Sequence, residues 1–180
     1  MDTIKKDFTN EVIDTVSLPR FEEAVLTPLQ PAYKKIMLIN VAIVYIIIGI
    51  AAGAVIYFIE ESRDYWPIAL LVFVLVIALS ILLVTISFKN RGFAFRNHDV
   101  IYKSGVLATS TIVIPYNRVQ HVALHEGILS RKYGLAAVEV FTAGGDTSDV
   151  KIAGIEKDEA ERIKQLLVGK ILKQDSRDGE

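Results

Sequence analysis

The chain has 180 residues, of which 52% are hydrophobic, and its formal net charge is −1. This length and composition leave room for one pair of membrane segments and one small domain, and they argue against a purely soluble protein. The sequence contains no cysteine, which excludes a disulfide framework and a thiolate metal site.

Residues 1–35 are expected to form an N-terminal arm. Pro19, Pro28 and Pro31 interrupt any long helix there, and charges of both signs are mixed along the segment. We therefore expect residues 17–33 to be irregular and to lie along the membrane surface or on the domain that follows.

Two apolar stretches follow, residues 36–59 and 66–88, and neither contains a charged residue. Each exceeds the roughly 20 residues that a helix needs to cross a hydrocarbon core about 30 Å thick. Backbone amides in lipid must be satisfied within the segment, so both stretches are predicted to be helices. The short connection between them predicts an antiparallel transmembrane hairpin over residues 36–88. A cleaved signal peptide is not expected, because the first stretch begins some 35 residues into the chain and is too long.

The charges around the hairpin predict its orientation. Basic residues flank its two open ends, namely Lys34, Lys35, Lys89, Arg91 and Arg96. The connecting turn instead carries Glu60, Glu61 and Asp64 against one arginine. By the positive-inside rule, both termini are predicted to be cytoplasmic.

Gly49 and Gly53 form a Gly-x-x-x-Gly pattern in the first apolar stretch, which permits another helix to approach closely. We expect these glycines to pack against the second helix of the hairpin, through Ala69, Ala78 or Ser80. Contact between two chains is the alternative.

After residue 88 the pattern changes to short runs rich in β-branched and aromatic residues. They lie at residues 93–96, 100–103, 109–114, 119–124, 136–142 and 150–155, separated by turn residues. These runs predict a meandering antiparallel sheet or barrel. Apolar residues then recur at helical spacing over residues 156–173, which predicts one amphipathic helix, and residues 174–180 form a polar tail.

Arg118, Arg131 and Lys132 are the candidate binding residues, for a lipid headgroup or an acidic partner. Arg131 and Lys132 are expected in a turn between strands, where they could converge with Arg118. Arg118 could instead pair with Glu126 or Glu139 across the sheet.

His121 and His125 resemble a zinc pair by spacing only. On a strand they would share a face but lie roughly 13 Å apart, too far to bind one ion together. Asp146 and Asp149 follow two glycines in a loop that could hold Ca²⁺ but lacks further acidic ligands. We expect no metal site.

The sequence contains no Gly-x-Ser-x-Gly, phosphate-binding loop or cofactor fingerprint. We therefore expect no catalytic residues and no cofactor.

Four segments together resemble the bacterial pleckstrin-homology-like domain of YdbS-type membrane proteins: residues 115–122 (PYNRVQHV), 127–129 (GIL), 131–136 (RKYGLA) and 142–145 (TAGG). The resemblance covers about residues 66–173. It implies an α+β membrane protein, in which the transmembrane hairpin precedes a pleckstrin-homology-like antiparallel barrel or sandwich at residues 89–173, capped by the C-terminal helix.

The resemblance also implies a non-enzymatic binding or scaffold module in the bacterial cytoplasmic membrane. Its expected partners are anionic leaflet lipids, a larger membrane relative with such domains, or further copies of the chain, and not nucleic acid. The alternative is an oligomeric membrane component with a direct transport or export role.

Overall fold

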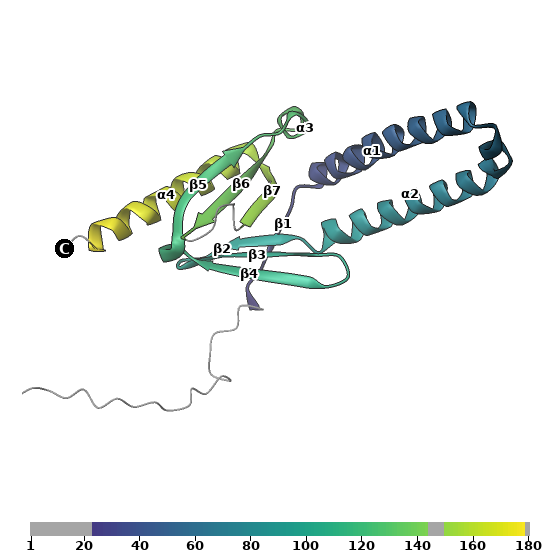
Figure 1. The fold of residues 1–180 in the computed structure, drawn as a ribbon. Coiled ribbons are helices and arrows are strands. Elements are labelled where there is room, and N and C mark those ends of the chain that lie inside the picture. Colours follow the sequence, from purple (N-terminus) through teal and green to yellow (C-terminus); the bar gives the residue numbers. More distant parts are fainter. Residues whose placement is uncertain (1–22, 144–149, 179–180) are drawn as a thin grey trace, which may run out of the picture.

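The computed structural model describes residues 23–143 and 150–178. A long helical hairpin projects from one end of a domain built of two sheets and a C-terminal helix (Figure 1).

The hairpin consists of α1 (Pro31–Phe58), a short 3₁₀-helix η3 (Glu60–Tyr65) and α2 (Trp66–Lys89). Both α-helices are long and apolar enough to cross a membrane, and the rest of the protein buries none of their most apolar windows. Such a surface requires lipid around it. The predicted membrane-spanning hairpin is therefore confirmed, although its first helix begins at Pro31 and not at residue 36.

The first sheet contains four antiparallel strands in the order β1 (Thr27–Pro28), β2 (Gly92–Phe95), β3 (Asp99–Gly105) and β4 (Thr109–Pro115). Thr27 pairs with Phe93 across β1 and β2, so residues before the hairpin belong to a sheet completed after it. The hairpin is thus inserted between two neighbouring strands of one sheet. The prediction of an irregular segment over residues 17–33 was wrong for its described part, because β1 and the start of α1 lie there.

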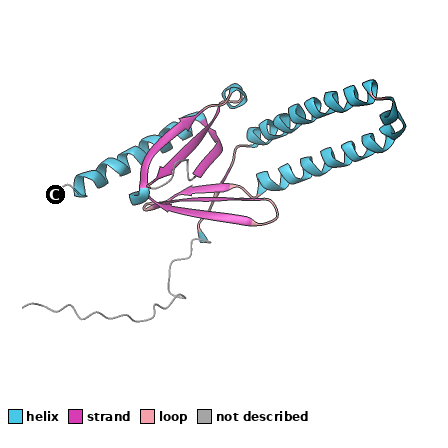
Figure 2. Cartoon of the chain, in the orientation of Figure 1, coloured by secondary structure: helices cyan, strands magenta, loops and turns pink. Residues whose placement is uncertain are grey.

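The second sheet contains β5 (Val119–His125), β6 (Leu135–Thr142) and β7 (Val150–Glu156), again antiparallel. A short 3₁₀-helix, η4 (Tyr116–Arg118), joins the two sheets, and a one-turn helix, α3 (Ile128–Lys132), lies between β5 and β6. Figure 2 shows the strands as two separate groups. The fold is therefore a sandwich and not a closed barrel.

One hydrophobic core joins both sheets and α4 (Lys157–Asp178). Val138 and Ile152 from the second sheet are fully buried in it, as are Ala160 and Leu167 of α4. The predicted capping helix is present, but it extends to Asp178, beyond the predicted end at residue 173. In Figure 1, α4 lies on the side of the second sheet that faces away from the hairpin.

The hairpin meets the domain without a linker. The backbone N–H of Gln30 donates to the carbonyl oxygen of Gly154 at 2.9 Å, and Tyr33 and Phe88 pack against the core. Gly154 has φ of +81°, and a Cβ there would lie 2.5 Å from Cγ of Tyr33. Only glycine therefore suits this close approach between α1 and β7.

The opposite end of the domain is held by a buried tyrosine. The hydroxyl of Tyr116 donates to the carbonyl oxygen of Arg96 at 2.6 Å, and the side chain of Arg96 pairs with Asp99. The ammonium of Lys170 on α4 lies 5.5 Å from the Tyr116 ring centre. Burial, with a smaller effect of Asp99, raises the pKa of Tyr116 to about 12.

We predict that Gly154→Ala lowers the free energy of unfolding by about 1 to 3 kcal/mol, because the new methyl group strains the backbone and collides with Tyr33. Gly134→Ala is the matched control, since its φ is +65° but no atom lies within 4 Å of the added Cβ. Thermal unfolding in detergent compares the two. Equal losses would show that Tyr33 does not restrict position 154.

We also predict that Tyr116→Phe costs about 1 kcal/mol at neutral pH, because the carbonyl of Arg96 loses its donor. The raised pKa means that the folded state favours the neutral phenol, so its contribution to stability is complete below pH 10 and is lost as the pH rises to about 12. Stability measured across this range should fall more steeply for the unchanged protein than for Tyr116→Phe. Burial also raises the pKa of Tyr102, so the stability of both proteins should fall somewhat with pH in this range. If stability falls equally steeply with pH in both proteins, Tyr116 is not the source of the additional pH dependence.

Candidate functional site

Basic side chains surround the junction between the hairpin and the domain. Lys34 and Lys35 lie in the first turns of α1, and Lys89 ends α2. The short helix α3 contacts α1 and ends with two further basic residues. We call this group the basic collar: Lys34, Lys35, Lys89, Arg91, Arg131 and Lys132.

Four collar side chains are exposed, namely Lys35, Lys89, Arg131 and Lys132, while Lys34 and Arg91 are half-buried. The Nε of Arg91 is buried and has no hydrogen-bond partner among the described residues. The charge of Arg91 also opposes the burial that raises the pKa of Tyr102. A cation at the root of α2 is thus incompletely satisfied by the protein itself.

Two acidic side chains of the second sheet and its connection to α3 have lysine partners. Glu126, which precedes α3, pairs with Lys157 at 3.1 Å, and Glu139 pairs with Lys151 at 2.7 Å. Among the described residues, none of the ion pairs includes a member of the collar. The collar therefore presents its positive charge to the surroundings.

The structure separates the three residues predicted to bind an anion. Arg118 precedes β5, whereas α3 follows it, and seven residues of strand span about 20 Å. Arg118 therefore does not converge with Arg131 and Lys132, which end a one-turn helix and do not occupy the predicted turn. The expected pairing of Arg118 with Glu126 or Glu139 is also wrong, because lysines occupy both carboxylates.

The histidines lie on a strand as predicted. His121 and His125 are exposed on β5, and His121 stacks on Phe141 with ring centres 4.1 Å apart. In the described ranges, no three histidine or acidic side chains cluster closely enough to hold a metal ion. The loop with Asp146 and Asp149 lies outside the described residues.

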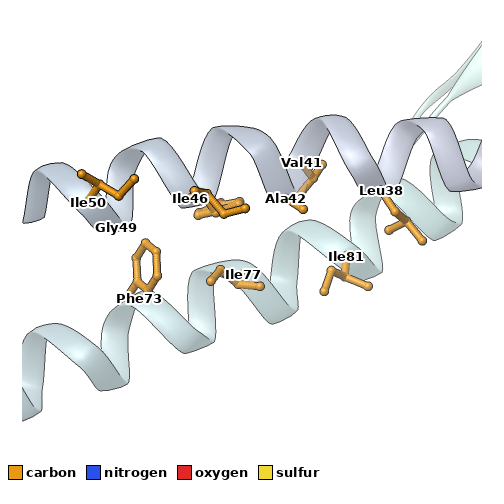
Figure 3. Close-up of a pocket in the computed structure, with 10 residues that line it drawn as sticks. Leu38, Val41, Ala42, Ile46, Gly49, Ile50, Phe73, Ile77 and Ile81 are labelled. Carbon is orange, nitrogen blue, oxygen red and sulfur yellow. The ribbon is translucent and has the colours of Figure 1, made fainter. Parts of the chain in front are cut away.

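The two helices of the hairpin enclose a groove of about 760 Å³, lined almost wholly by apolar side chains. Figure 3 shows Phe73 pointing from α2 toward Gly49 of α1. A Cβ at Gly49 would lie 3.4 Å from that ring, whereas a Cβ at Gly53 would meet no atom within 4 Å. Gly49 thus lies against Phe73 of α2, whereas Gly53 has no such neighbour.

The small residues expected to pack against the glycines do not touch the positions of their added Cβ atoms. Ser80 shares a hydrogen bond of 2.7 Å with Tyr45, whose ring also packs edge-on against Phe73 at 5.8 Å. Ala69 lines a second space of about 280 Å³ beside Gly53. The helices are thus held by a polar and aromatic contact near their middle and are less tightly packed at Gly53.

Comparison with known proteins identifies a family and one relative. The family model described as bacterial PH domain matches residues 17–170, a span that begins before the hairpin and ends within α4. A 79-residue segment is 32% identical to the UPF0699 transmembrane protein YdbS of Bacillus subtilis (strain 168). That segment is 44% of this chain and 48% of the relative, so the match spans about half the length of that protein. No solved structure matches the chain.

We predict different effects for leucine at the two glycines. Gly49→Leu should push α1 away from Phe73 and lower the thermal stability of the protein in detergent, whereas Gly53→Leu should leave a single chain nearly unchanged. If Gly53 instead serves contact between chains, Gly53→Leu will reduce the oligomer size measured by light scattering. A fully stable Gly49→Leu variant would contradict the contact with Phe73.

Proposed function

This chain belongs to the bacterial PH domain family, and we propose that it is a non-enzymatic, membrane-anchored binding module of the bacterial cytoplasmic membrane. The family and the two apolar helices support a membrane-associated module with a PH-like domain. The binding role rests on one observation, the basic collar around the helices at the point where they enter the domain.

The charge distribution supports a cytoplasmic domain. The collar lies at the domain end of the hairpin, and Glu60, Glu61 and Asp64 lie at the far end, in η3. Membrane proteins retain basic flanks on the cytoplasmic side. We therefore propose that both termini are cytoplasmic.

Anionic lipids of the inner leaflet are the first proposed partner. A basic residue close to an anionic membrane contributes about 1 kcal/mol of attraction. The collar residues qualify because the helices that carry or contact them enter the bilayer directly. Arg131 and Lys132 supply the exposed charge beside α1.

A protein partner is the second part of the proposal. The strand β4 is an edge of the first sheet, and Ile112 and Val113 on it are more than a third exposed. An exposed strand edge can accept a further strand from another chain. We propose that this edge serves assembly with a larger membrane relative or with a second copy. The hairpin anchor would raise the local concentration of such a partner.

A transport role has less support. The apolar segments 36–59 and 66–88 contain no charged residue, and such residues commonly mark an ion or substrate path. The groove between the helices is lined by apolar side chains and by Tyr45, whose hydroxyl shares a hydrogen bond with Ser80.

We predict that replacing Arg131 and Lys132 together with alanine reduces the anionic lipid that stays with the protein after purification in mild detergent. Mass spectrometry of the retained phosphatidylglycerol and phosphatidylethanolamine gives their ratio. The expected change is a several-fold loss of enrichment, since two exposed charges contribute about 1 kcal/mol each.

Arg118→Ala is the matched control, because Arg118 is also exposed but lies at the opposite end of β5. Unchanged enrichment in the double variant would contradict the lipid role of α3. The same samples reveal any protein that co-purifies in fixed ratio. The absence of such a protein from native membranes, together with a single-chain mass in detergent, would contradict the proposed assembly.

A further inference from the structure

Two aliphatic side chains project from the domain with almost no contact to it. Leu107 is 92% exposed in the connection between β3 and β4, and Ile128 is 91% exposed at the start of α3. Covering a side chain of this size yields roughly 1.5 to 3 kcal/mol. Exposure of both side chains to water is therefore unfavourable, and their burial against another surface would stabilise the protein.

Both side chains are fixed at the end of the domain that meets the hairpin. Asn90, which caps α2, donates from Nδ2 to the carbonyl oxygen of Val106 at 3.3 Å, next to Leu107. On the other side, α3 contacts α1. In Figure 1 the β3–β4 connection and α3 flank the hairpin, one beside each helix.

The lengths of the helices give the depth of these contacts. α1 has 28 residues, or about 42 Å at 1.5 Å each, while a hydrocarbon core takes about 20 residues. Counted from Phe58, the first two turns of α1 therefore lie among the headgroups on the domain side. The same count from Trp66 places Lys89 and Asn90 in that layer, because α2 has 24 residues. The β3–β4 connection is bonded to Asn90 and α3 contacts α1, so both lie at about this depth.

The chemistry around the two side chains suits a lipid surface. Ile128 shares its single helical turn with Arg131 and Lys132, and Lys103 lies on the strand that leads to Leu107. Aliphatic side chains accompanied by lysine or arginine are the pattern of segments that lie in the membrane interface. Glu126, the acid before α3, is paired with Lys157.

We propose that Leu107 and Ile128 insert into the headgroup layer of the leaflet that the hairpin enters and so hold the domain against the membrane at two points. The occupant of this surface is the anionic lipid bilayer itself. The inference rests on the proposed function in placing the domain on a lipid surface, and it adds the residues and the depth of contact. With the hairpin as a third point, the orientation of the domain is fixed.

The absence of cysteine allows a direct test on the full chain. Single variants Leu107→Cys, Ile128→Cys and Leu172→Cys are labelled with a nitroxide and placed in vesicles of phosphatidylethanolamine and phosphatidylglycerol. Leu172 is the matched control, a 64% exposed leucine near the far end of α4. The measurement compares label relaxation by oxygen, which partitions into lipid, with relaxation by a water-soluble nickel complex.

We expect labels at 107 and 128 to show several-fold less nickel relaxation and more oxygen relaxation than the label at 172. Water-like labels at either 107 or 128 overturn docking at two points. Protection that disappears when the protein is diluted into more lipid also overturns it, because a second copy would then be the cover. If both labels are water-like while the double variant of Arg131 and Lys132 still loses anionic lipid, the insertion fails and the proposed function stands.

Discussion

The insertion of a membrane hairpin between two hydrogen-bonded strands is the constraint on which the rest of the structure depends. Thr27 in β1 must pair with Phe93 in β2 although both transmembrane helices separate them in the chain. The two helices must therefore return to the same point, which an antiparallel hairpin achieves and a single span cannot. The contact of Gly154 with Gln30 and Tyr33 then fixes α1 directly on the second sheet.

A domain held in this way has no tether that would let it move away from the bilayer. On the proposed function, its surface at the root of the hairpin stays close to the headgroup layer, so weak interactions there act without a further cost of association. Under this proposal, a loose set of basic side chains is enough to attract the leaflet, and the lipid need not be enclosed. The six collar residues come from three helices and one connection, and attraction to an anionic leaflet requires no precise geometry of any of them.

Local patterns in the sequence account for most of the fold. The hairpin, the six longer strands and α4 all produce strong periodicity over their own residues, so their existence could be predicted. β1 could not be predicted, because a strand of two residues, one of them Pro28, is too short to show periodicity. It is a strand only because it pairs with β2. Arg118 and Arg131 are separated by the length of β5 and by the helical conformation of Ile128–Lys132. This helix could not be predicted, because a segment of five residues is too short to contain an apolar repeat. The exposure of Leu107 and Ile128 is likewise a property of the packed domain.

The distribution of ion pairs gives the domain two chemically different ends. At the end away from the hairpin, Arg96 is neutralised by Asp99, and Lys170 is engaged by the carbonyl oxygen of Asn97 and the ring of Tyr116. Lysines likewise neutralise Glu139 and Glu126 along the second sheet. Each of these pairs removes one positive and one negative charge, so the positive charge of the collar reflects where the remaining basic residues lie in a chain that is close to neutral as a whole. The electrostatic asymmetry of the protein therefore arises from the fold bringing basic residues that are distant in the chain, such as Lys34, Lys89 and Arg131, to the same end of the domain.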